Sequence, residues 1–262
     1  MDLTIVGASA ATQNPGGACS SYLLRQGGTS VILDMGSGAF GRLQQHVEPD
    51  AVDAIVISHL HADHTLDLIP YRYWLDFRGA DARPHQPHQP HQPRRPRLLL
   101  PPEGHEKLLR ISGLQDPSPT FFSDVFDVAE YDPTRPIQLG ELTVGFHATK
   151  HIPHTYALRV TNPGGATLAY SADSGPCPAL LDVARAADLF LCENTNAEDS
   201  TYDLHLKPSQ AAAYARDAGA CRLVLTHRWH LSGLDAAARS AAGVFDGPVS
   251  IAREGATYTV GV

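Results

Sequence analysis

Short hydrophobic runs separated by glycine-rich turns fill the first third of the chain. Their length and their content of branched residues predict β-strands, and the stretch after the third run has a helical pattern. We expect strands at residues 4–6, 21–25, 30–33 and 54–57, and a helix at 40–46. This order predicts a sheet with helices packed outside it.

The second half repeats the alternation. We expect strands at 142–146, 156–160, 167–171, 188–192 and 222–226, and helices at 177–187, 209–218 and 234–242. Gly219 is placed to end the second of these helices, and a final pair of strands follows the third. Two such halves predict an α/β protein in which two sheets stack and helices cover both outer faces.

Residues 84–96 read PHQPHQPHQPRRP and differ from the rest of the chain. Proline at every third position forbids a helix and favours an extended, solvated segment. We therefore expect a single domain, residues 1–262, with an exposed insertion at about 83–97.

Hydrophobic residues make up 43% of the chain and charged residues 18%, which suits a globular protein. The formal net charge of −8 repels long phosphate backbones, so a nucleic-acid polymer is a disfavoured partner. The chain has no basic leader and no long apolar stretch, so we expect a cytoplasmic protein outside the membrane. None of the cysteines forms a C-x-x-C pair, and free, buried thiols are expected at Cys19, Cys177, Cys192 and Cys221.

The strongest chemical signal is Ser-His-Leu-His-Ala-Asp-His, which directly follows the apolar strand at 54–57. It places His59, His61, Asp63 and His64 within six positions, where the chain must turn. Imidazole and carboxylate are ligands that zinc prefers, although manganese or iron can occupy similar sites. The segment predicts a metal site.

This motif resembles the signature of the metallo-β-lactamase fold superfamily, in its ribonuclease Z-like, phosphodiesterase-type branch. The resemblance covers nearly the whole chain. It is carried in order by Gly7, by Leu-Asp-Met-Gly at 33–36, by residues 59–64, by His151, by Tyr-Ser-Ala-Asp at 170–173 and by Thr-His at 226–227. It implies a four-layer αβ/βα sandwich with two metal ions at one edge between the sheets.

The resemblance also implies the ligands. One ion would be held by His59, His61 and His151, the other by Asp63, His64 and His227, and Asp173 would bridge the two. His154 is a rival for His151, and His230 is a rival for His227.

Further residues are expected beside the ions. Asp34 and Glu193 follow strands and can orient metal-bound imidazoles through their second ring nitrogen. His205 precedes a helix at a position where related phosphodiesterases carry a histidine beside the metals. Lys207 stands where those proteins have a small hydroxyl residue, which weakens the expected helix cap.

The chemistry implied is hydrolysis of a small phosphodiester, such as a cyclic nucleotide, by a water activated between two zinc ions. Asp63 would orient or deprotonate that water, and His205 would stabilise the oxyanion or protonate the leaving alkoxide. The same ligands also allow hydrolysis of a carboxylic ester, lactone or thioester. A third alternative is a metal-binding protein that has lost its activity.

True ribonuclease Z enzymes carry a basic arm, in many cases between the third-motif histidine and the bridging aspartate. Only 22 positions separate His151 from Asp173, which leaves no room for that arm and favours a small-molecule substrate. A homodimer is possible. Aromatic residues at Tyr71, Tyr73, Trp74 and Phe77 can form a pocket wall, a dimer contact or ordinary core.

Overall fold

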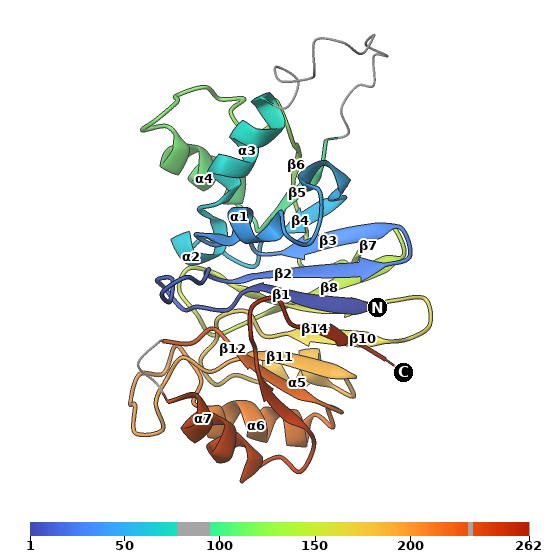
Figure 1. The fold of residues 1–262 in the computed structure, drawn as a ribbon, viewed down its shortest axis with the longest axis vertical. Helices are drawn as coiled ribbons and strands as arrows, with labels where there is room; N and C mark the ends of the chain where they lie inside the picture. Colours follow the sequence, from blue (N-terminus) through green and yellow to red (C-terminus); the bar gives the residue numbers. More distant parts are fainter. Residues whose placement is uncertain (78–94, 230–232, 262) are drawn as a thin grey trace.

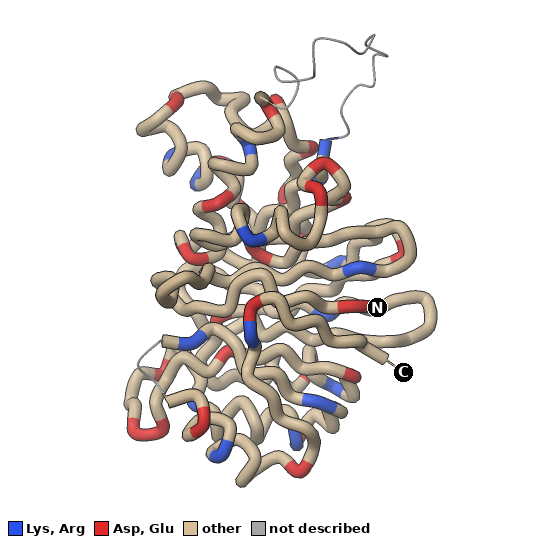
Figure 2. The backbone as a smooth tube through the Cα atoms, viewed as in Figure 1, with Lys and Arg blue, Asp and Glu red and all other residues tan. Residues whose placement is uncertain are grey.

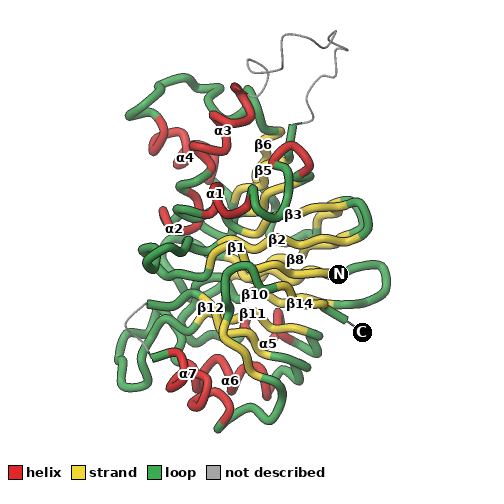
Figure 3. Tube along the Cα trace, viewed as in Figure 1, coloured by secondary structure: helices red, strands yellow, loops and turns green. Residues whose placement is uncertain are grey.

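The computed structural model describes residues 1–77, 95–229 and 233–261. Within those ranges the strands assemble into two seven-stranded mixed sheets that stack on each other, and helices cover both outer faces (Figure 1). Figure 3 shows the same order, with helices at the two ends of the view and strands between them. The predicted α/β class and four-layer sandwich are confirmed.

The first sheet has the order β14-β1-β2-β3-β4-β5-β6, antiparallel from β14 to β3 and parallel from β3 to β6. Its strands are β1 (Asp2–Gly7), β2 (Ser21–Gln26), β3 (Thr29–Leu33), β4 (Ala54–Val56), β5 (Arg97–Leu100), β6 (Asp127–Glu130) and β14 (Thr257–Thr259). The helical segments of this half are α1 (Ala39–Leu43), η1 (Pro49–Ala51), α2 (Ala62–Thr65), α3 (Leu68–Phe77) and α4 (Gly104–Ser112).

The second sheet has the order β13-β12-β11-β10-β9-β8-β7, parallel from β13 to β10 and antiparallel from β10 to β7. Its strands are β7 (Ile137–Leu139), β8 (Leu142–Ala148), β9 (Tyr156–Thr161), β10 (Thr167–Tyr170), β11 (Leu189–Glu193), β12 (Leu223–Thr226) and β13 (Val249–Ile251). Its helices are α5 (Ala179–Ala184), α6 (Pro208–Asp217) and α7 (Leu234–Ala242).

Three hydrophobic layers hold the four layers of secondary structure together. Side chains alternate along each strand, so β3 sends Val31 and Leu33 into the layer between the sheets and Ile32 into the layer under the helices. Val224 of β12 likewise lies between the sheets, while its strand neighbours pack under α5 to α7. Each fully buried side chain of this size contributes about 1.5–3 kcal/mol relative to an exposed one.

The structure corrects part of the sequence reading. The final two strands do not pair with each other, because β13 extends the second sheet and β14 pairs with β1 of the first. Helices α3 and α4 and strands β5, β6 and β7 were not expected. Of these, β5 begins at Arg97, within the expected insertion. The His-Gln-Pro repeat at residues 84–93 lies outside the described part of the chain, which omits residues 78–94.

Most of the aromatic residues at 71–77 are ordinary core. Tyr71 is buried and stacks on Phe40, and Tyr73 and Trp74 pack partly against the same layer, whereas Phe77 is exposed. The cysteines are free, but only two of them are buried: Cys177 is half-buried and Cys221 is exposed, which corrects that expectation. Among the described helices, none has the length and apolar character needed to cross a membrane.

Candidate metal centre

The segments that carry the predicted ligands meet at one edge of the two sheets. The loop that bears residues 59–64 follows β4, and His151, Asp173 and His227 follow β8, β10 and β12. Strands β8, β10 and β12 point the same way, because β9 is antiparallel to both β8 and β10 and the strands from β10 to β12 are parallel. Their carboxyl ends therefore reach the same edge, where ligands bind in open α/β sheets.

The first group of donor atoms comes from His59, His61, His151 and Asp173. The Nδ1 atom of His61 lies 3.1 Å from Nε2 of His59 and 3.3 Å from Nε2 of His151. Asp173 Oδ2 lies 3.6 Å from Nε2 of both His59 and His151. Four donors from three segments of the sequence thus converge on one point.

The second group comes from Asp63, His64 and His227, with Asp173 again beside it. Asp63 Oδ2 lies 3.1 Å from Nε2 of His227 and 3.6 Å from Nε2 of His64. Asp173 Oδ1 lies 3.3 Å from Nε2 of His64 and 3.4 Å from Nε2 of His227. The two oxygens of Asp173 therefore face different groups.

These distances fit a divalent ion. Ligands about 2.0–2.1 Å from a tetrahedral zinc lie roughly 3.3–3.4 Å from one another, which is near the spacing of both groups. Among the described atoms, Asp173 Oδ1 is a buried carboxylate oxygen with no hydrogen-bond donor. A buried carboxylate is costly unless a cation or donor satisfies it, so the donor set suits bound metal at the position that Asp173 shares.

The ring nitrogens that face away from the cluster are held by the protein. Such contacts fix the tautomer and orientation of a metal-binding imidazole. The Nδ1 contacts are His59 with Ser58 Oγ at 3.0 Å, His64 with Asp34 Oδ2 at 2.8 Å, His151 with the Leu204 carbonyl at 3.0 Å, and His227 with Thr195 Oγ1 at 2.8 Å.

Asp34 is fully buried and accepts four hydrogen bonds. The donors are the backbone N–H and hydroxyl of Ser58, the hydroxyl of Tyr170 at 2.8 Å and the Nδ1 of His64. Burial and the neighbouring Asp34 carboxylate hold the pKa of Tyr170 well above its usual range, so its hydroxyl stays a donor. The expectation that Asp34 contacts a ligand histidine agrees with this geometry.

The electrostatics of the cluster favour a cation. Burial lowers the pKa values of His59, His61 and His151, which keeps these rings neutral and able to coordinate. Burial alone would also lower the pKa of His64, but the carboxylates of Asp173 and Asp34 outweigh it and hold that pKa well above its usual range. The site attracts positive charge at its centre.

The carboxylates of Asp63 and Asp173 stay ionised because histidines lie beside them. Burial would raise the pKa values of Asp63 and Asp173, but the neighbouring His227 and His64 outweigh it and hold both pKa values well below the usual range. Asp63 Oδ2 also accepts the backbone N–H of Ala11 at 2.7 Å. Both groups are therefore anionic at neutral pH and available to a cation.

His205 lies beside the cluster on the loop before α6. Its Nδ1 is 2.7 Å from Glu193 Oε1, and its ring lies 5.0 Å from that of His151 and 5.6 Å from that of His227. Burial would lower the pKa of His205, but the hydrogen bond and charge of Glu193 raise it above the ordinary value. Glu193 thus contacts His205 rather than one of the seven predicted ligands.

The weak helix cap expected at Lys207 is compensated by other residues. Gln210 accepts the backbone N–H of Lys207 at 3.0 Å. Glu198 accepts the backbone N–H of Ser209 at 2.9 Å and its hydroxyl at 2.5 Å. A carboxylate at a helix N-terminus also interacts favourably with the helix dipole, so the loop that carries His205 is anchored where α6 begins.

Backbone strain gathers at the same edge. Asp34, Ala172 and His227 have φ values of 59°, 49° and 52°, in the left-handed region that residues with a side chain rarely adopt. Each such residue costs about 1–3 kcal/mol and persists only where its surroundings enforce it. All three lie in or beside the cluster, as is common at functional sites.

A cavity of about 430 Å³ opens onto the cluster. His61, Asp63, Asp173, His205 and His227 reach its surface. Thr195, Asn196, Tyr202 and Trp229 complete much of the wall and were not expected from the sequence, although Trp229 stands two residues after a predicted ligand. Ser58 and Thr195, which hold ligand rings, were missed because a single hydroxyl residue has no distinctive pattern.

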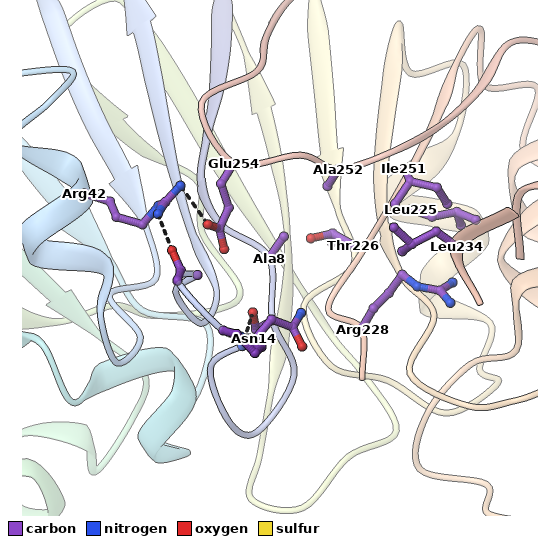
Figure 4. A pocket seen from close by; sticks show the side chains of 14 residues that line it. Ala8, Asn14, Arg42, Leu225, Thr226, Arg228, Leu234, Ile251, Ala252 and Glu254 are labelled. Carbon is purple, nitrogen blue, oxygen red and sulfur yellow. Dashed lines mark hydrogen bonds and ion pairs between the residues drawn. The ribbon is translucent and has the colours of Figure 1, made fainter. Parts of the chain in front are cut away.

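A second cavity, of about 320 Å³, lies behind one wall of the metal site. Alternate residues of the chain from Thr226 to Trp229 face the two cavities, with Thr226 and Arg228 in the second one and His227 and Trp229 in the first. Figure 4 shows Arg42 joined to Glu254 at the opposite side of this second cavity from Arg228. The seven predicted ligands do not reach it.

The structure distinguishes one of the two predicted histidines from its alternative by their positions relative to the cluster. His151 lies in the cluster, whereas His154 is exposed and lies outside it. His227 lies in the cluster, and His230 falls outside the described residues.

Comparison with known proteins agrees with this geometry. Residues 29–228 match the beta-lactamase superfamily domain, which is most of the chain. The chain belongs to the beta-lactamase superfamily. The match spans β3 to the end of β12 and so includes every segment that contributes to the cluster.

Relatives within the superfamily extend over nearly the full chain. An uncharacterized protein of Mycobacterium leprae is 34% identical, covering 98% of this chain and 88% of that protein. A ribonuclease Z of Myxococcus xanthus is 28% identical, covering 97% and 96%. The crystal structure of the metallo-beta-lactamase fold protein YhfI of Bacillus subtilis superposes with a TM-score of 0.85 at 25% identity, covering 98% of both chains.

Proposed function

We propose that this protein is a hydrolase of small phosphodiesters, such as cyclic nucleotides, and that it uses two zinc ions. The observation that carries the proposal is the pair of donor groups joined by the two oxygens of Asp173, with His205 at the edge of the same cavity. Relatives named ribonuclease Z and probable metallo-hydrolase, at 28% and 29% identity, support this reaction class.

The ligand assignment follows the two groups. His59, His61 and His151 would hold one ion and Asp63, His64 and His227 the other, with Asp173 shared. Manganese or iron could take the place of zinc in such a set. Bound ions of this kind lower the pKa of water and neutralise charge on phosphate oxygens.

The protein's own residues would supply orientation and a proton. Asp63 is ionised and held by the Ala11 N–H, so its carboxylate is fixed at the cavity surface, where it can orient an attacking water. His205 keeps a proton at higher pH than an ordinary histidine because of Glu193, and it can donate that proton to the leaving alkoxide.

A small substrate is favoured over an RNA polymer. The 22 positions from His151 to Asp173 contain β9 and β10, which form an antiparallel pair and leave no segment for a long arm. Acidic and basic residues are interspersed over both halves of the molecule (Figure 2), and the net charge is −8. Such a surface attracts a polyanion weakly.

Metal content is tested first. Elemental analysis of protein purified without added metal should find two ions per chain. His61→Ala removes a ligand of the first donor group, so this variant should contain fewer than two ions per chain. His154→Ala is the matched control, because its side chain is exposed and outside the cluster. Full metal content in His61→Ala would contradict the ligand assignment.

Reaction class is tested with the metal-loaded protein. Cyclic nucleotides and bis-p-nitrophenyl phosphate should be hydrolysed, and a panel of lactones, thioesters and carboxylic esters should not. His205→Ala should lower kcat on the phosphodiesters by roughly 10²–10⁴-fold while the metal content stays the same. Faster turnover of a lactone or thioester than of every phosphodiester would assign carbonyl chemistry instead, and inertness toward all would indicate a non-catalytic metal-binding protein.

A further inference from the structure

Two large aromatic side chains line the cavity above the metal cluster and are largely open to solvent. Tyr202 is 55% exposed and Trp229 is 46% exposed, whereas the ligands His59, His64 and His227 are almost fully buried. Exposed aromatic surface beside a polar site is a common feature of ligand-binding pockets, in which it becomes buried when the ligand binds.

Tyr202 is held in position by its own loop. Its N–H is bonded to Ser200 Oγ at 3.2 Å, and its carbonyl accepts the amide of Asn196 at 2.6 Å. The next residue, Asp203, forms an ion pair with Lys150 at 2.5 Å. A ring on an anchored loop loses little conformational freedom on binding, so its contacts with a ligand are gained at low entropic cost.

Trp229 is positioned by hydrogen bonds between the preceding residue and the loop after β1. The preceding residue, Arg228, bonds through its N–H to the Ala8 carbonyl at 3.1 Å and through its carbonyl to the Ala10 N–H at 3.2 Å. The bridge between these two segments places Trp229 directly beyond His227 at the cavity wall.

The ring of Tyr202 continues a series of aromatic rings that begins at the metal cluster. His205 is stacked on His227 at 5.6 Å, and Tyr202 lies 5.8 Å from His205. The wall therefore changes from polar donors at the cluster to uncharged aromatic faces at the rim. Such faces stack on flat π systems, and every nucleobase has such a face.

We propose that Tyr202 and Trp229 bind a flat heteroaromatic group of the substrate, of the nucleobase class, while its phosphate lies at the metal cluster. This inference rests on the proposed phosphoester function for the position of the phosphate. It makes both residues determinants of specificity: they select phosphate esters that carry a base over esters that lack one.

The test uses the protein's own fluorescence. The chain has two tryptophans, and Trp74 packs near Phe40 and does not line the cavity, so Trp74→Phe leaves Trp229 as the single reporter. Adenosine 5′-monophosphate should quench Trp229 saturably in the zinc-loaded protein. Ribose 5-phosphate, which offers the same phosphate and sugar without a base, should quench far less and bind roughly 10- to 100-fold more weakly.

Variants separate stacking from phosphate binding. By calorimetry, Tyr202→Ala and Trp229→Ala should each weaken adenosine 5′-monophosphate roughly 10- to 100-fold and leave ribose 5-phosphate within about twofold. Tyr202→Phe and Trp229→Tyr keep a ring and should retain most of the affinity. Metal content and melting temperature equal to those of the parent protein establish that each variant is folded.

The outcomes are distinct. Equal affinity for the two phosphates, equal weakening of both by the alanine variants, or no saturable quenching by adenosine 5′-monophosphate overturns the inference. Because the assay measures binding without turnover, base-dependent quenching in a protein that hydrolyses no phosphodiester would contradict the proposed function alone. Equal kcat/KM for phosphodiesters with and without a flat aromatic group would contradict the inference alone.

Discussion

Single buried groups determine whether the ligands point at the metal positions. Asp34 is the clearest case, because one fully buried carboxylate orients His64, accepts the hydroxyl of Tyr170 and caps the chain at Ser58. The backbone of Asp34 is in the left-handed region, which is strained for a residue with a side chain, so the surrounding contacts must hold Asp34 in this position. The stability of the site is therefore expected to be concentrated in a few residues.

Asp34→Ala should destabilise the metal-free protein by about 3–5 kcal/mol, because it leaves several buried donors without an acceptor. The free energy of unfolding in urea measures this. Tyr170→Phe is the matched control, since it removes one of the four hydrogen bonds and should cost only about 1 kcal/mol. Equal losses in the two variants would show that Asp34 does not have this central role.

A pH dependence is expected from the pair of His205 and Glu193. Glu193 raises the pKa of His205, so a rate that needs protonated His205 persists as pH rises until that raised pKa is passed. Glu193→Gln removes the charge, lowers the pKa of His205, and should move the alkaline fall in kcat to lower pH. The measurement is the pH profile of kcat at constant metal content.

His205→Ala provides the comparison for this profile, because it should have no such alkaline fall to move. An unchanged profile in Glu193→Gln would remove His205 as the proton donor.

At the scale of elements, the site depends on close contacts between the loops that follow strands. Gly36, after β3, lies so near the loop after β4 that a Cβ atom there would be 2.0 Å from the carbonyl oxygen of Asp63. In the turn after β3, the Met35 N–H also donates a hydrogen bond to the His64 carbonyl in the loop after β4, at 2.8 Å. The loop of residues 59–64 is thus packed directly against the turn that carries Asp34.

Gly36→Ala should displace the loop at Asp63, destabilise the protein by about 1–3 kcal/mol and lower its metal content. Gly41→Ala is the matched control within α1, where a Cβ meets nothing within 4 Å, and it should stabilise the protein by about 0.5–1 kcal/mol. Thermal unfolding and elemental analysis of both variants measure the difference. A Gly36→Ala protein with full metal content would contradict the close packing.

At the scale of the whole molecule, the candidate metal ligands come from both halves. Residues 59–64 belong to the half built on the first sheet, while His151, Asp173 and His227 extend from strands of the second. Ions held between them would bind the folded chain and not the unfolded one, so they would stabilise the contact between the sheets.

Removing the metal should therefore lower the melting temperature. At a free zinc concentration about 100 times the dissociation constant, each bound ion adds about 2.7 kcal/mol, which corresponds to roughly 5–10 °C per ion for a chain of this size. Chelation followed by addition of zinc, monitored by calorimetry, measures the change and its reversal. His227→Ala should lose most of the zinc effect and His154→Ala should keep it; identical melting with and without chelator would contradict a metal that bridges the halves.

The hydrophobic pattern was sufficient to predict the α/β class and the order of most elements, and the His-x-His-x-Asp-His motif was sufficient to predict four candidate ligands. The four-layer sandwich and the candidates His151, Asp173 and His227 were implied by the family resemblance. The pattern and the motif are local features, because strand periodicity and ligand clustering are present within a few consecutive residues. The same reading failed where a segment has little local pattern, as with β5 beside the proline repeat and with β14, whose partner β1 lies at the other end of the chain.

The tertiary structure decided what depends on distance between remote residues. It placed His151 rather than His154 in the cluster, directed the two oxygens of Asp173 to different donor groups, and brought Tyr202 and Trp229 to the same cavity. It also assigned Glu193 to His205 and Thr195 to His227. No local pattern encodes such pairings, because they arise only when packing of the two sheets brings the ends of separate strands to one edge.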